Sequence, residues 1–487
     1  MKFNKKPLDY NFIKKWSKYG INQIILSILY RRNIVDDNDL IDFVNPIFEN
    51  IIQPFEFPQI DLAYKRLSQA LENNEKILVF GDRDVDGTTS VSILFSFLQK
   101  YTNNIFWEVP TGEDVYGLDR KKFANWRKNG YSLCITVDCG ITNVNEIEEL
   151  KTLGIDTIII DHHKPLETVP NSISIVNPKC EKDFKFTDIA ACGVVFIFIY
   201  GFLIYKSFIY NKKIIVVYEE NNIIKVDSYI NLIYQSQTVI NSIFDIKNIS
   251  KDLIYFYSDS LTIEDGIKLN NLFTKETIIN QPEDKSKIVK LIFFNNILRE
   301  IEDIEKIKEE YLPVVMFGLI ADVMPIIKTN RIFVKLGLEH LRNNKNINLS
   351  TLFKKINIDI SLCSSKDVAW NICPILNASG RIGCANVTVD FLTAKKDIET
   401  KVSLMLGNNE ERKKKGEDAF NVFIEDLHSN KKYYDDNLTF FYSEKIARGI
   451  TGITATKIAN QVNCPVIVAA KEGEYYTGSM RGKSNVH

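Results

Sequence analysis

The chain has 487 residues, of which 45% are hydrophobic and 25% charged, and its formal net charge is −1. These fractions are typical of folded proteins and exclude bulk disorder, while the length predicts two to four domains with room for a cleft between them. The near-zero net charge excludes nucleic-acid binding driven by the charge of the whole molecule. Any phosphate-binding surface must therefore be a local cluster of Lys and Arg.

Three features predict a cytoplasmic protein. The eight cysteines contain no CxxC pair, which argues against a disulfide framework and against a cysteine-ligated zinc site. The N-terminus, MKFNKKPLDYNF, lacks the apolar stretch of a secretory signal. The longest apolar run, at 194–205, is too short to span a bilayer and predicts a buried helix.

The first half of the chain has the pattern of an α/β domain. Short apolar runs at 76–80, 132–137 and 157–160 predict buried parallel strands. Helical patterns at 62–71 and 144–153 precede the first and the third of them. This alternation predicts a doubly wound parallel sheet.

The second half is less regular. The residue pattern changes over 203–312, which predicts an inserted α/β module. Within it, the charged stretch 300–311 is typical of a solvated helix face. A long helical pattern at 401–427 predicts a spacer between two lobes, and a last α/β segment begins at 437.

An acidic cluster follows the first predicted strand. Asp82, Asp84 and Asp86 alternate within GDRDVDGTT, with glycines on both sides, so that two of them can turn toward one point. Carboxylates in this arrangement suit hard divalent cations. The alternatives are an acidic turn and a calcium loop, but the further acids and the closing Glu of an EF-hand are absent.

Acids and histidines also follow the next two predicted strands. Asp138 lies in TVDCGIT, where a helix cap is an equally simple explanation for a single acid. Asp161 precedes His162 and His163, and these are two of only five histidines in the chain. Because ligands gather at the carboxyl ends of parallel strands, this pair favours a functional site over a structural role.

One more acid stands in an apolar stretch. Asp322 lies in GLIADVMP, where burial without a partner would cost several kcal/mol, so a metal partner or a helix cap is expected. An oxygen-rich ligand set with one imidazole suits Mn²⁺ or Mg²⁺ better than structural zinc. The predicted ligands are Asp82, Asp84, Asp138, His162 and Asp322. Two ions about 3.5–4 Å apart could clamp a phosphoryl group, with Asp138 as the candidate bridge.

The order and spacing of these motifs resemble the DHH phosphoesterase superfamily. The matching motifs are DRDVDG, TVDCG, DHH and GLIADVMP. Further stretches resemble the RecJ-type single-strand-specific exonucleases: RRNIVDDNDLIDFVNPIFENIIQPFEFP near the N-terminus, VYGL at 115–118, IVNPK at 175–179 and ILNASGRIG at 375–383.

The resemblance implies a 5′-to-3′ exonuclease that hydrolyses single-stranded DNA in repair and recombination with Mn²⁺ or Mg²⁺. Its candidate protein partners are a single-strand-binding protein or a helicase. By position the five predicted ligands match the metal ligands of the family, and Asp138, His162 and His163 match its catalytic residues. Of these, His163 matches the histidine that faces the scissile phosphate.

The resemblance also implies phosphate-binding residues. Arg381 in NASGR matches a phosphate-contacting arginine, although an ordinary surface arginine is the alternative. The last segment resembles the accessory phosphate-binding domain of the superfamily, through a glycine-rich turn entering a helix and a GSxR strand end. The remaining implied substrate-binding residues are Asn377, Gly380, Gly449, Gly452, Ser479 and Arg481.

The implied organisation has three parts. Residues 1–345 form the DHH catalytic domain with the insert at 203–312, residues 346–435 carry NASGR and a connecting helix, and residues 436–487 form a partial accessory domain. The sequence ends soon after GSMRG, before the further motif and the OB-type barrel of the family. It thus resembles a C-terminally truncated member. If this is the natural end of the protein, low processivity is expected; if the sequence is a fragment, this expectation does not apply.

Three positions depart from the family pattern. Phe80 stands where many members carry a metal-binding histidine, which predicts a looser first metal site. Arg83 replaces the usual aromatic and either weakens metal binding or recruits phosphate. Ala447 stands where a histidine is common.

Other functions stay open. A phosphodiesterase of short oligonucleotides or cyclic dinucleotides has the same metal chemistry, whereas a pyrophosphatase would leave NASGR unexplained. An inactive DHH scaffold protein is the non-enzymatic alternative. Such scaffolds usually lose their ligand acids, and this chain has an acid in each of the four motifs.

Overall fold

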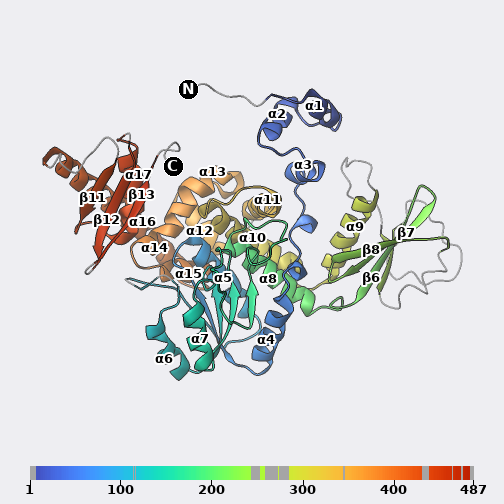
Figure 1. Cartoon of the computed structure of the whole chain (residues 1–487), viewed down its shortest axis with the longest axis horizontal. Helices are drawn as coiled ribbons and strands as arrows, with labels where there is room; N and C mark the ends of the chain where they lie inside the picture. Colours follow the sequence, from blue (N-terminus) through green and yellow to red (C-terminus); the bar gives the residue numbers. More distant parts are fainter. Residues whose placement is uncertain are drawn as a thin grey trace.

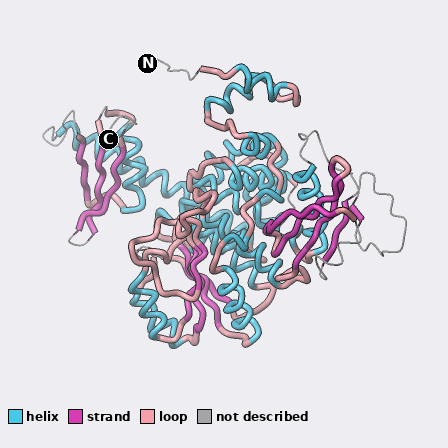
Figure 2. Tube along the Cα trace, turned by 45° about the vertical axis from the view of Figure 1, so that its right-hand side comes forward, coloured by secondary structure: helices cyan, strands magenta, loops and turns pink. Residues whose placement is uncertain are grey.

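The computed structural model of the chain describes residues 7–112, 114–115, 117–242, 253–257, 272–273, 285–343, 346–429, 438–462, 464–472 and 475–482. The described strands form three separate sheets, each accompanied by helices (Figures 1 and 2). The central sheet carries the site, and the other two lie on opposite sides of it in Figure 1.

The central sheet is entirely parallel, with the order β2-β1-β3-β4-β5. Its strands are β1 (Lys76–Gly81), β2 (Ile105–Glu108), β3 (Tyr131–Val137), β4 (Asp156–Ile160) and β5 (Ser174–Val176). The three strands predicted from apolar runs are β1, β3 and β4, so this part of the prediction is confirmed. Such continuous apolar runs are expected where both faces of a sheet are covered.

Helices cover both faces of this sheet. Along β1, Ile77 and Val79 join one hydrophobic core, while Leu78 and Phe80 join another on the opposite face. The larger core includes α4 (Ile60–Glu72), α5 (Val85–Leu98) and α8 (Ala191–Tyr205). The smaller core includes α6 (Arg120–Lys128) and α7 (Val144–Thr152). The doubly wound α/β architecture is therefore confirmed.

Helix α8 contains the longest apolar run of the sequence and is buried along almost its whole length, as predicted. It packs on α4, where the Tyr64 hydroxyl donates a hydrogen bond of 3.0 Å to the carbonyl of Phe198. Among the helices that the structure describes, none is both long enough and apolar enough to cross a membrane.

The region predicted as an inserted module contains a second, mixed sheet with the order β10-β9-β6-β7-β8. Its strands are β6 (Lys213–Glu220), β7 (Ile223–Ile230), β8 (Ile233–Ile240), β9 (Leu253–Tyr257) and β10 (Leu272–Phe273). Helix α9 (Lys285–Glu300) follows. The charged stretch after it is not one continuous helix, because Asp303 adopts a left-handed conformation with φ of 68° and α10 (Ile304–Ala321) starts beyond it.

The remaining helices fall into two groups: the first three form a small core of their own, and most of the others contribute to the larger core of the central lobe. They are α1 (Tyr10–Ser17), α2 (Gln23–Arg31), α3 (Asp37–Val44), α11 (Lys328–Arg342), α12 (Ile347–Lys355), α13 (Ser365–Asp367), α14 (Cys373–Arg381) and α15 (Asn386–Leu392). A π-helical turn, Val368–Ile372, precedes α14.

The predicted spacer is the 32-residue helix α16 (Ile398–Ser429). Its first half contributes Val402 and Met405 to the core of the central lobe, and its second half contributes Ala419 and Phe423 to the core of the C-terminal lobe. That lobe contains β11 (Thr439–Ser443), α17 (Thr451–Ala459), β12 (Val466–Glu472) and β13 (Tyr475–Arg481). The prediction of a smaller α/β domain joined by a long helix is confirmed.

The packing of α8 on α4 gives a stability prediction. A Cβ atom at Gly201 would overlap the Tyr64 hydroxyl and Pro54, and Tyr64 is already held by its hydrogen bond to α8. We expect Gly201→Ala to lower the free energy of unfolding by about 1–3 kcal/mol. The control is Gly407→Ala on α16, where no atom lies within 4 Å, and it should raise stability by up to about 1 kcal/mol. Thermal unfolding that shifts equally for both variants would contradict the packing.

Candidate metal centre

The candidate site lies where the central sheet reverses its winding. Strand β1 has β2 on one side and β3 on the other, so the chain leaves β1 in one direction and returns in the other. Crevices at such points, at the carboxyl ends of the strands, are the usual binding sites of parallel sheets. Acidic and histidine side chains follow β1, β3 and β4 there.

The turn between β1 and α5 holds two of the predicted ligands. Asp84 is the N-cap of α5, and its Oδ1 accepts a hydrogen bond of 3.0 Å from the N–H of Gly87. Asp82 is 7% exposed, and its buried Oδ1 has no hydrogen-bond partner. A Cβ atom at Gly87 would lie 2.5 Å from the Asp82 carbonyl oxygen, so this turn requires glycine.

Asp138 links the ends of β3 and β4. Its backbone is left-handed, with φ of 57°, and its N–H donates to the carbonyl of Ile160 at 3.1 Å. Aspartate tolerates this conformation better than most residues. Its Oδ1 lies 3.2 Å from Nε2 of His162 and 3.9 Å from Nδ1 of His163.

Asp161 fixes the two histidines without joining the ligands. Its Oδ1 accepts hydrogen bonds from the N–H groups of His162 and His163 at 2.7 and 3.0 Å and contacts Nδ1 of His163 at 2.8 Å. Burial alone would raise the pKa of Asp161, but the hydrogen bond with His163 and the backbone N–H groups hold it below its usual range. The same hydrogen bond raises the pKa of His163.

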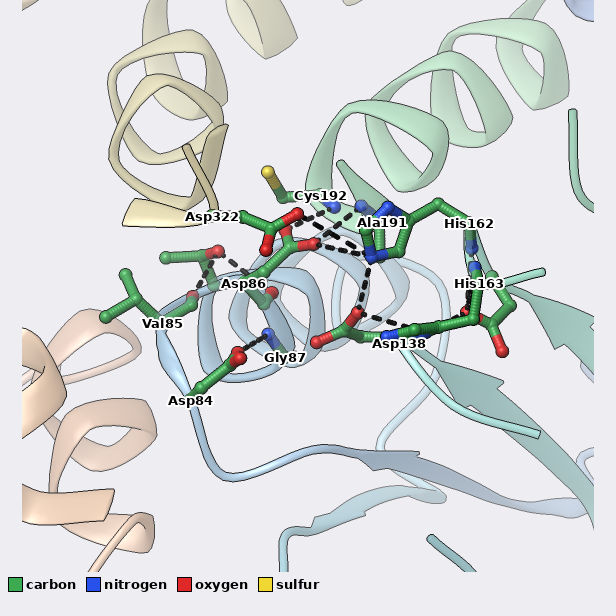
Figure 3. Close-up of polar contacts among 12 residues, drawn as sticks. Asp84, Val85, Asp86, Gly87, Asp138, His162, His163, Ala191, Cys192 and Asp322 are labelled. Atoms are coloured by element: carbon green, nitrogen blue, oxygen red, sulfur yellow. Dashed lines mark hydrogen bonds and ion pairs between the residues drawn. The ribbon is translucent and has the colours of Figure 1, made fainter. Parts of the chain in front are cut away.

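His162 and Asp322 complete the cluster. In Figure 3, the carboxylates of Asp86, Asp138 and Asp322 surround the ring of His162, whose Nε2 lies 3.7 Å from Asp86 Oδ2 and from Asp322 Oδ2. Burial lowers the pKa of His162 and so favours the neutral imidazole that binds metals. Asp322 caps the C-terminal end of α10.

Asp86 was named in the acidic cluster of the sequence but was not among the predicted ligands, and the structure places it beside His162. It is 2% exposed, and it accepts hydrogen bonds from the N–H groups of Ala191 and Cys192 at 2.7 and 2.9 Å, which caps α8. The start of α8 gives a reason to look for such an acid: the N-cap residue Ala190 has no side chain that can accept a hydrogen bond, so the first N–H groups of the helix need an acceptor from elsewhere in the chain. Asp161 was noted only as part of its motif, and its anchoring role follows from tertiary hydrogen bonds.

All five predicted ligands lie in one cluster. Together with Asp86 and His163 they form three overlapping sets, and within each set the ligand atoms lie within 4.8 Å of one another. The sets are Asp82, Asp84 and Asp138; Asp138, His162 and His163; and Asp86, His162 and Asp322. Asp138 belongs to the first two. Buried carboxylate oxygens without a hydrogen-bond partner occur in Asp82, Asp138 and Asp322. This donor set fits hard divalent cations, because it is rich in oxygen and three of its carboxylate oxygens have no hydrogen-bond partner.

The electrostatics of the cluster agree with that fit. Burial and then the charge of Asp84 raise the pKa of Asp82 to about 6. Burial and then the charges of Asp86 and Asp84 raise the pKa of Asp322 to about 7. Burial and the same neighbours also raise the pKa of Asp138. Each carboxylate is therefore destabilised by its neighbours, and bound cations would relieve that repulsion.

Of the predicted phosphate-binding residues, Gly380 packs against the carbonyl of Arg83 in the turn that carries two predicted ligands, and Arg381 interacts with the charge of Asp84. Arg381 ends α14, and its Nη1 donates to the carbonyl of Gly449 at 3.3 Å. Arg381, Gly452 and Arg481 line a pocket of about 430 Å³ together with Ile453, Thr456, Lys457 and Asn460. Cβ atoms at Gly380 and Gly449 would overlap the carbonyls of Arg83 and Arg381, so glycine lets these segments approach closely.

The other predicted substrate-binding residues lie around the same pocket or on α14. Ser479 places its Oγ 3.1 Å from Oγ1 of Thr451, at the start of α17. Asn377 is half-buried on α14.

The structure shows what surrounds the three residues that depart from the family pattern. Phe80 packs on Trp126, with ring centroids 5.6 Å apart, on the face of the sheet covered by α6. Arg83 donates from Nη2 to the carbonyl of Asp114 at 2.5 Å and so holds the loop before α6. Ala447 precedes the turn that leads into α17.

Comparison with known proteins identifies the central lobe. Residues 76–224 match the model of the DHH family, N-terminal domain. Over these residues the chain is similar to the DHH family. The chain is 25% identical over 460 residues to the single-stranded-DNA-specific exonuclease RecJ of Bacillus subtilis, covering 93% of this chain and 45% of that protein. It is 26% identical to RecJ of Salmonella typhimurium, covering 87% of this chain and 59% of that protein.

Solved structures show the same fold. The structure of RecJ in complex with Mn²⁺ from Thermus thermophilus matches with a TM-score of 0.66 at 18% identity, covering 98% of this chain and 55% of that one. A structure of exonuclease RecJ bound to manganese matches with a TM-score of 0.58 at 20% identity, covering 88% and 83%. The predicted resemblance around the DHH domain is confirmed, and the chain spans about half the length of the curated relatives it matches.

The raised carboxyl pKa values predict pH-dependent metal affinity. A protonated carboxyl cannot bind a cation, so protons compete with Mn²⁺ below about pH 6 at Asp82 and below about pH 7 at Asp322. We expect the Mn²⁺ affinity to fall by on the order of tenfold between pH 8 and pH 6. Calorimetric titration with Mn²⁺ at pH 6, 7 and 8 measures this. An affinity that does not change with pH would contradict the cluster as a carboxylate metal site.

Proposed function

We propose that the chain is a two-metal exonuclease that hydrolyses phosphodiester bonds of single-stranded DNA in the 5′-to-3′ direction, in DNA repair and recombination. The observation that supports it best is the position of Arg381, which borders the carboxylate cluster through α14 and also lines the arginine-rich pocket. Successive phosphates of one nucleic-acid strand could therefore contact the carboxylate cluster and the arginine-rich pocket. The printed names of the relatives support single-stranded DNA as the substrate.

We assign metal binding to Asp82, Asp84, Asp138, His162 and Asp322, with Asp138 as the bridge because it belongs to two of the ligand sets. Mn²⁺ or Mg²⁺ is the proposed cofactor, since Thermus thermophilus RecJ has been solved in complex with each. When bound, two such cations would supply Lewis-acid activation of the phosphate and of the attacking water.

His163 is the proposed partner of the scissile phosphate. Its side chain is 43% exposed, whereas that of His162 is 6% exposed. Asp161 holds Nδ1, which fixes the ring and raises the pKa of His163. A protonated imidazole in this orientation can donate a hydrogen bond to a phosphate oxygen as negative charge develops there.

Arg381 has a complementary role in the proposal. Burial lowers the pKa of its guanidinium, and the group nevertheless stays cationic because an arginine starts from a very high value. A half-buried guanidinium can bind two phosphate oxygens at once. With Gly380 and Asn377 on the same helix, it would position the strand against the cluster.

The wider organisation is also part of the proposal. We propose a catalytic region at 1–345 with an insert at 203–312, a connecting region at 346–435 and a phosphate-binding region at 436–487. Gly449, Gly452, Ser479 and Arg481 would form the phosphate site of the last region. A cytoplasmic location agrees with eight free cysteines, and a single-strand-binding protein or a helicase is the candidate partner.

Digestion of end-labelled DNA tests the proposal. With Mn²⁺, we expect 5′-labelled single strands to release labelled mononucleotides at once, while 3′-labelled strands shorten progressively. Asp138→Asn should lower kcat by at least about a hundredfold to a thousandfold, because it removes a group that organises transition-state charge. Asp418→Asn, at an exposed position on α16, should leave kcat unchanged.

The outcome also separates the alternatives. Long strands that stay intact while short oligonucleotides or cyclic dinucleotides are hydrolysed would favour a small-substrate phosphodiesterase. The absence of any hydrolysis that depends on Asp138 would contradict the enzyme and favour a scaffold protein.

A further inference from the structure

Helix α16 carries an arginine within its buried stripe. Residues four apart share one face of a helix, and Asn408, Arg412 and Gly416 follow that spacing. Asn408 donates to the Ser379 hydroxyl on α14 at 3.0 Å, and a Cβ atom at Gly416 would lie 3.9 Å from Cγ2 of Ile453 on α17. Arg412 therefore faces the space between α14 and α17, beside the pocket that Arg381 and Arg481 line, and its charge acts on Arg381.

The guanidinium of Arg412 has a fixed orientation. Its Nε and Nη2 donate to Oδ1 of Asn409 at 3.2 and 3.0 Å. Asn409 is only 6% exposed, so this acceptor is itself held in place. An arginine has five N–H donors, and the two used here leave others for a ligand.

Among the described residues, the arginines at and beside this pocket have no close ion pair with a carboxylate, although Asp84 acts at longer range on Arg381 and Glu410 on Arg412. In the part of the chain that the structure describes, no Asp or Glu forms an ion pair with Arg381, Arg412 or Arg481. Neighbouring lysines on α16 differ, because Lys413 pairs with Glu410 and Lys415 with Glu411, each at 2.7 Å.

Arg412 and Arg481 both act on Arg381 through their positive charges. Burial lowers the pKa of Arg381, and the charge of Arg412 lowers it further. Like charges held together in a partly buried pocket are costly unless an anion joins them. A phosphate group is an anion that three guanidinium groups can bind through short, charge-assisted hydrogen bonds.

We propose that Arg412 is a further phosphate-binding residue, oriented by Asn409, and that it binds the phosphate next to the scissile one together with Arg381 and Arg481. The identity of the ligand as a nucleic-acid strand rests on the proposed function. Arg381 would contact both phosphates. It lines the pocket, and it is close enough to the carboxylate cluster for the charge of Asp84 to offset part of the fall in its pKa that burial causes. Asn409 is a positioning residue that acts through Arg412.

The test measures the affinity for single-stranded DNA by fluorescence anisotropy in EDTA, together with KM and kcat in Mn²⁺. We expect Arg412→Gln to raise the dissociation constant and KM about tenfold, as for a lost charge-assisted hydrogen bond. The slope of log affinity against log salt should fall by about 0.7, the value for one lost contact to a single strand. Lys413→Gln removes the same charge from an exposed, paired position and should change the affinity less than about twofold.

A second variant separates positioning from fold stability. Asn409→Asp keeps the acceptor oxygen and the shape of the side chain but places a carboxylate against Arg412. We expect it to unfold at the same temperature as the wild type and yet to raise KM as much as Arg412→Gln, with little change in kcat. Wild-type affinity in both variants would overturn the inference.

Strands with one neutral methylphosphonate linkage locate the contact. The loss caused by Arg412→Gln should vanish when the neutral linkage replaces the contacted phosphate, and should persist at other positions. A loss that is equal for every strand would overturn the contact. Cleavage that is unaffected by Arg412→Gln would overturn this inference and leave the proposed function standing, whereas Arg412-dependent binding without cleavage would do the reverse.

Discussion

The mutual repulsion of buried carboxylates is the constraint on which the site depends. The ends of β1 and β3 and the end of α10 bring Asp82, Asp138 and Asp322 together, and burial and neighbouring charges raise the pKa of each. Such a cluster costs free energy in the folded protein, because each ionised group disfavours the next. Divalent cations would reverse the sign of this interaction, and phosphate could then approach a site that would otherwise repel it.

The scaffold holds this cluster with backbone groups more than with other side chains. Asp86 is fixed by two N–H groups at the start of α8, where the helix dipole favours a negative charge. Asp161 is fixed by the N–H groups of Ile141, His162 and His163. Both acids anchor elements next to the ligands and leave the ligand oxygens of Asp82, Asp138 and Asp322 without hydrogen-bond partners. Arg381, at the end of α14, provides the opposite charge close enough to interact with Asp84.

The sequence predicted the parts that depend on local pattern. Continuous apolar runs identified β1, β3 and β4, and the placement of acids after these strands identified candidate ligands that the structure brings together. The rest depends on tertiary contacts. The alternation of Asp82, Asp84 and Asp86 does not show that α5 begins at Val85, which turns Asp86 toward α8. The expectation that Arg83 weakens metal binding or recruits phosphate stays a prediction; its guanidinium donates to the carbonyl of Asp114, and its charge partly offsets the rise that burial causes in the pKa of Asp82. Arg412 looks like part of a charge run until its helical face is known.

We propose that this cluster would hold two divalent cations, with Asp138 as a shared ligand. The most direct measurement is electron paramagnetic resonance of the protein titrated with Mn²⁺, combined with the number of ions bound per chain. The account predicts two ions whose spins are coupled, because a shared carboxylate keeps them about 3.5–4 Å apart, and conversion to an uncoupled or singly occupied site in Asp138→Asn. One isolated Mn²⁺ signal in the wild type at saturation would contradict it.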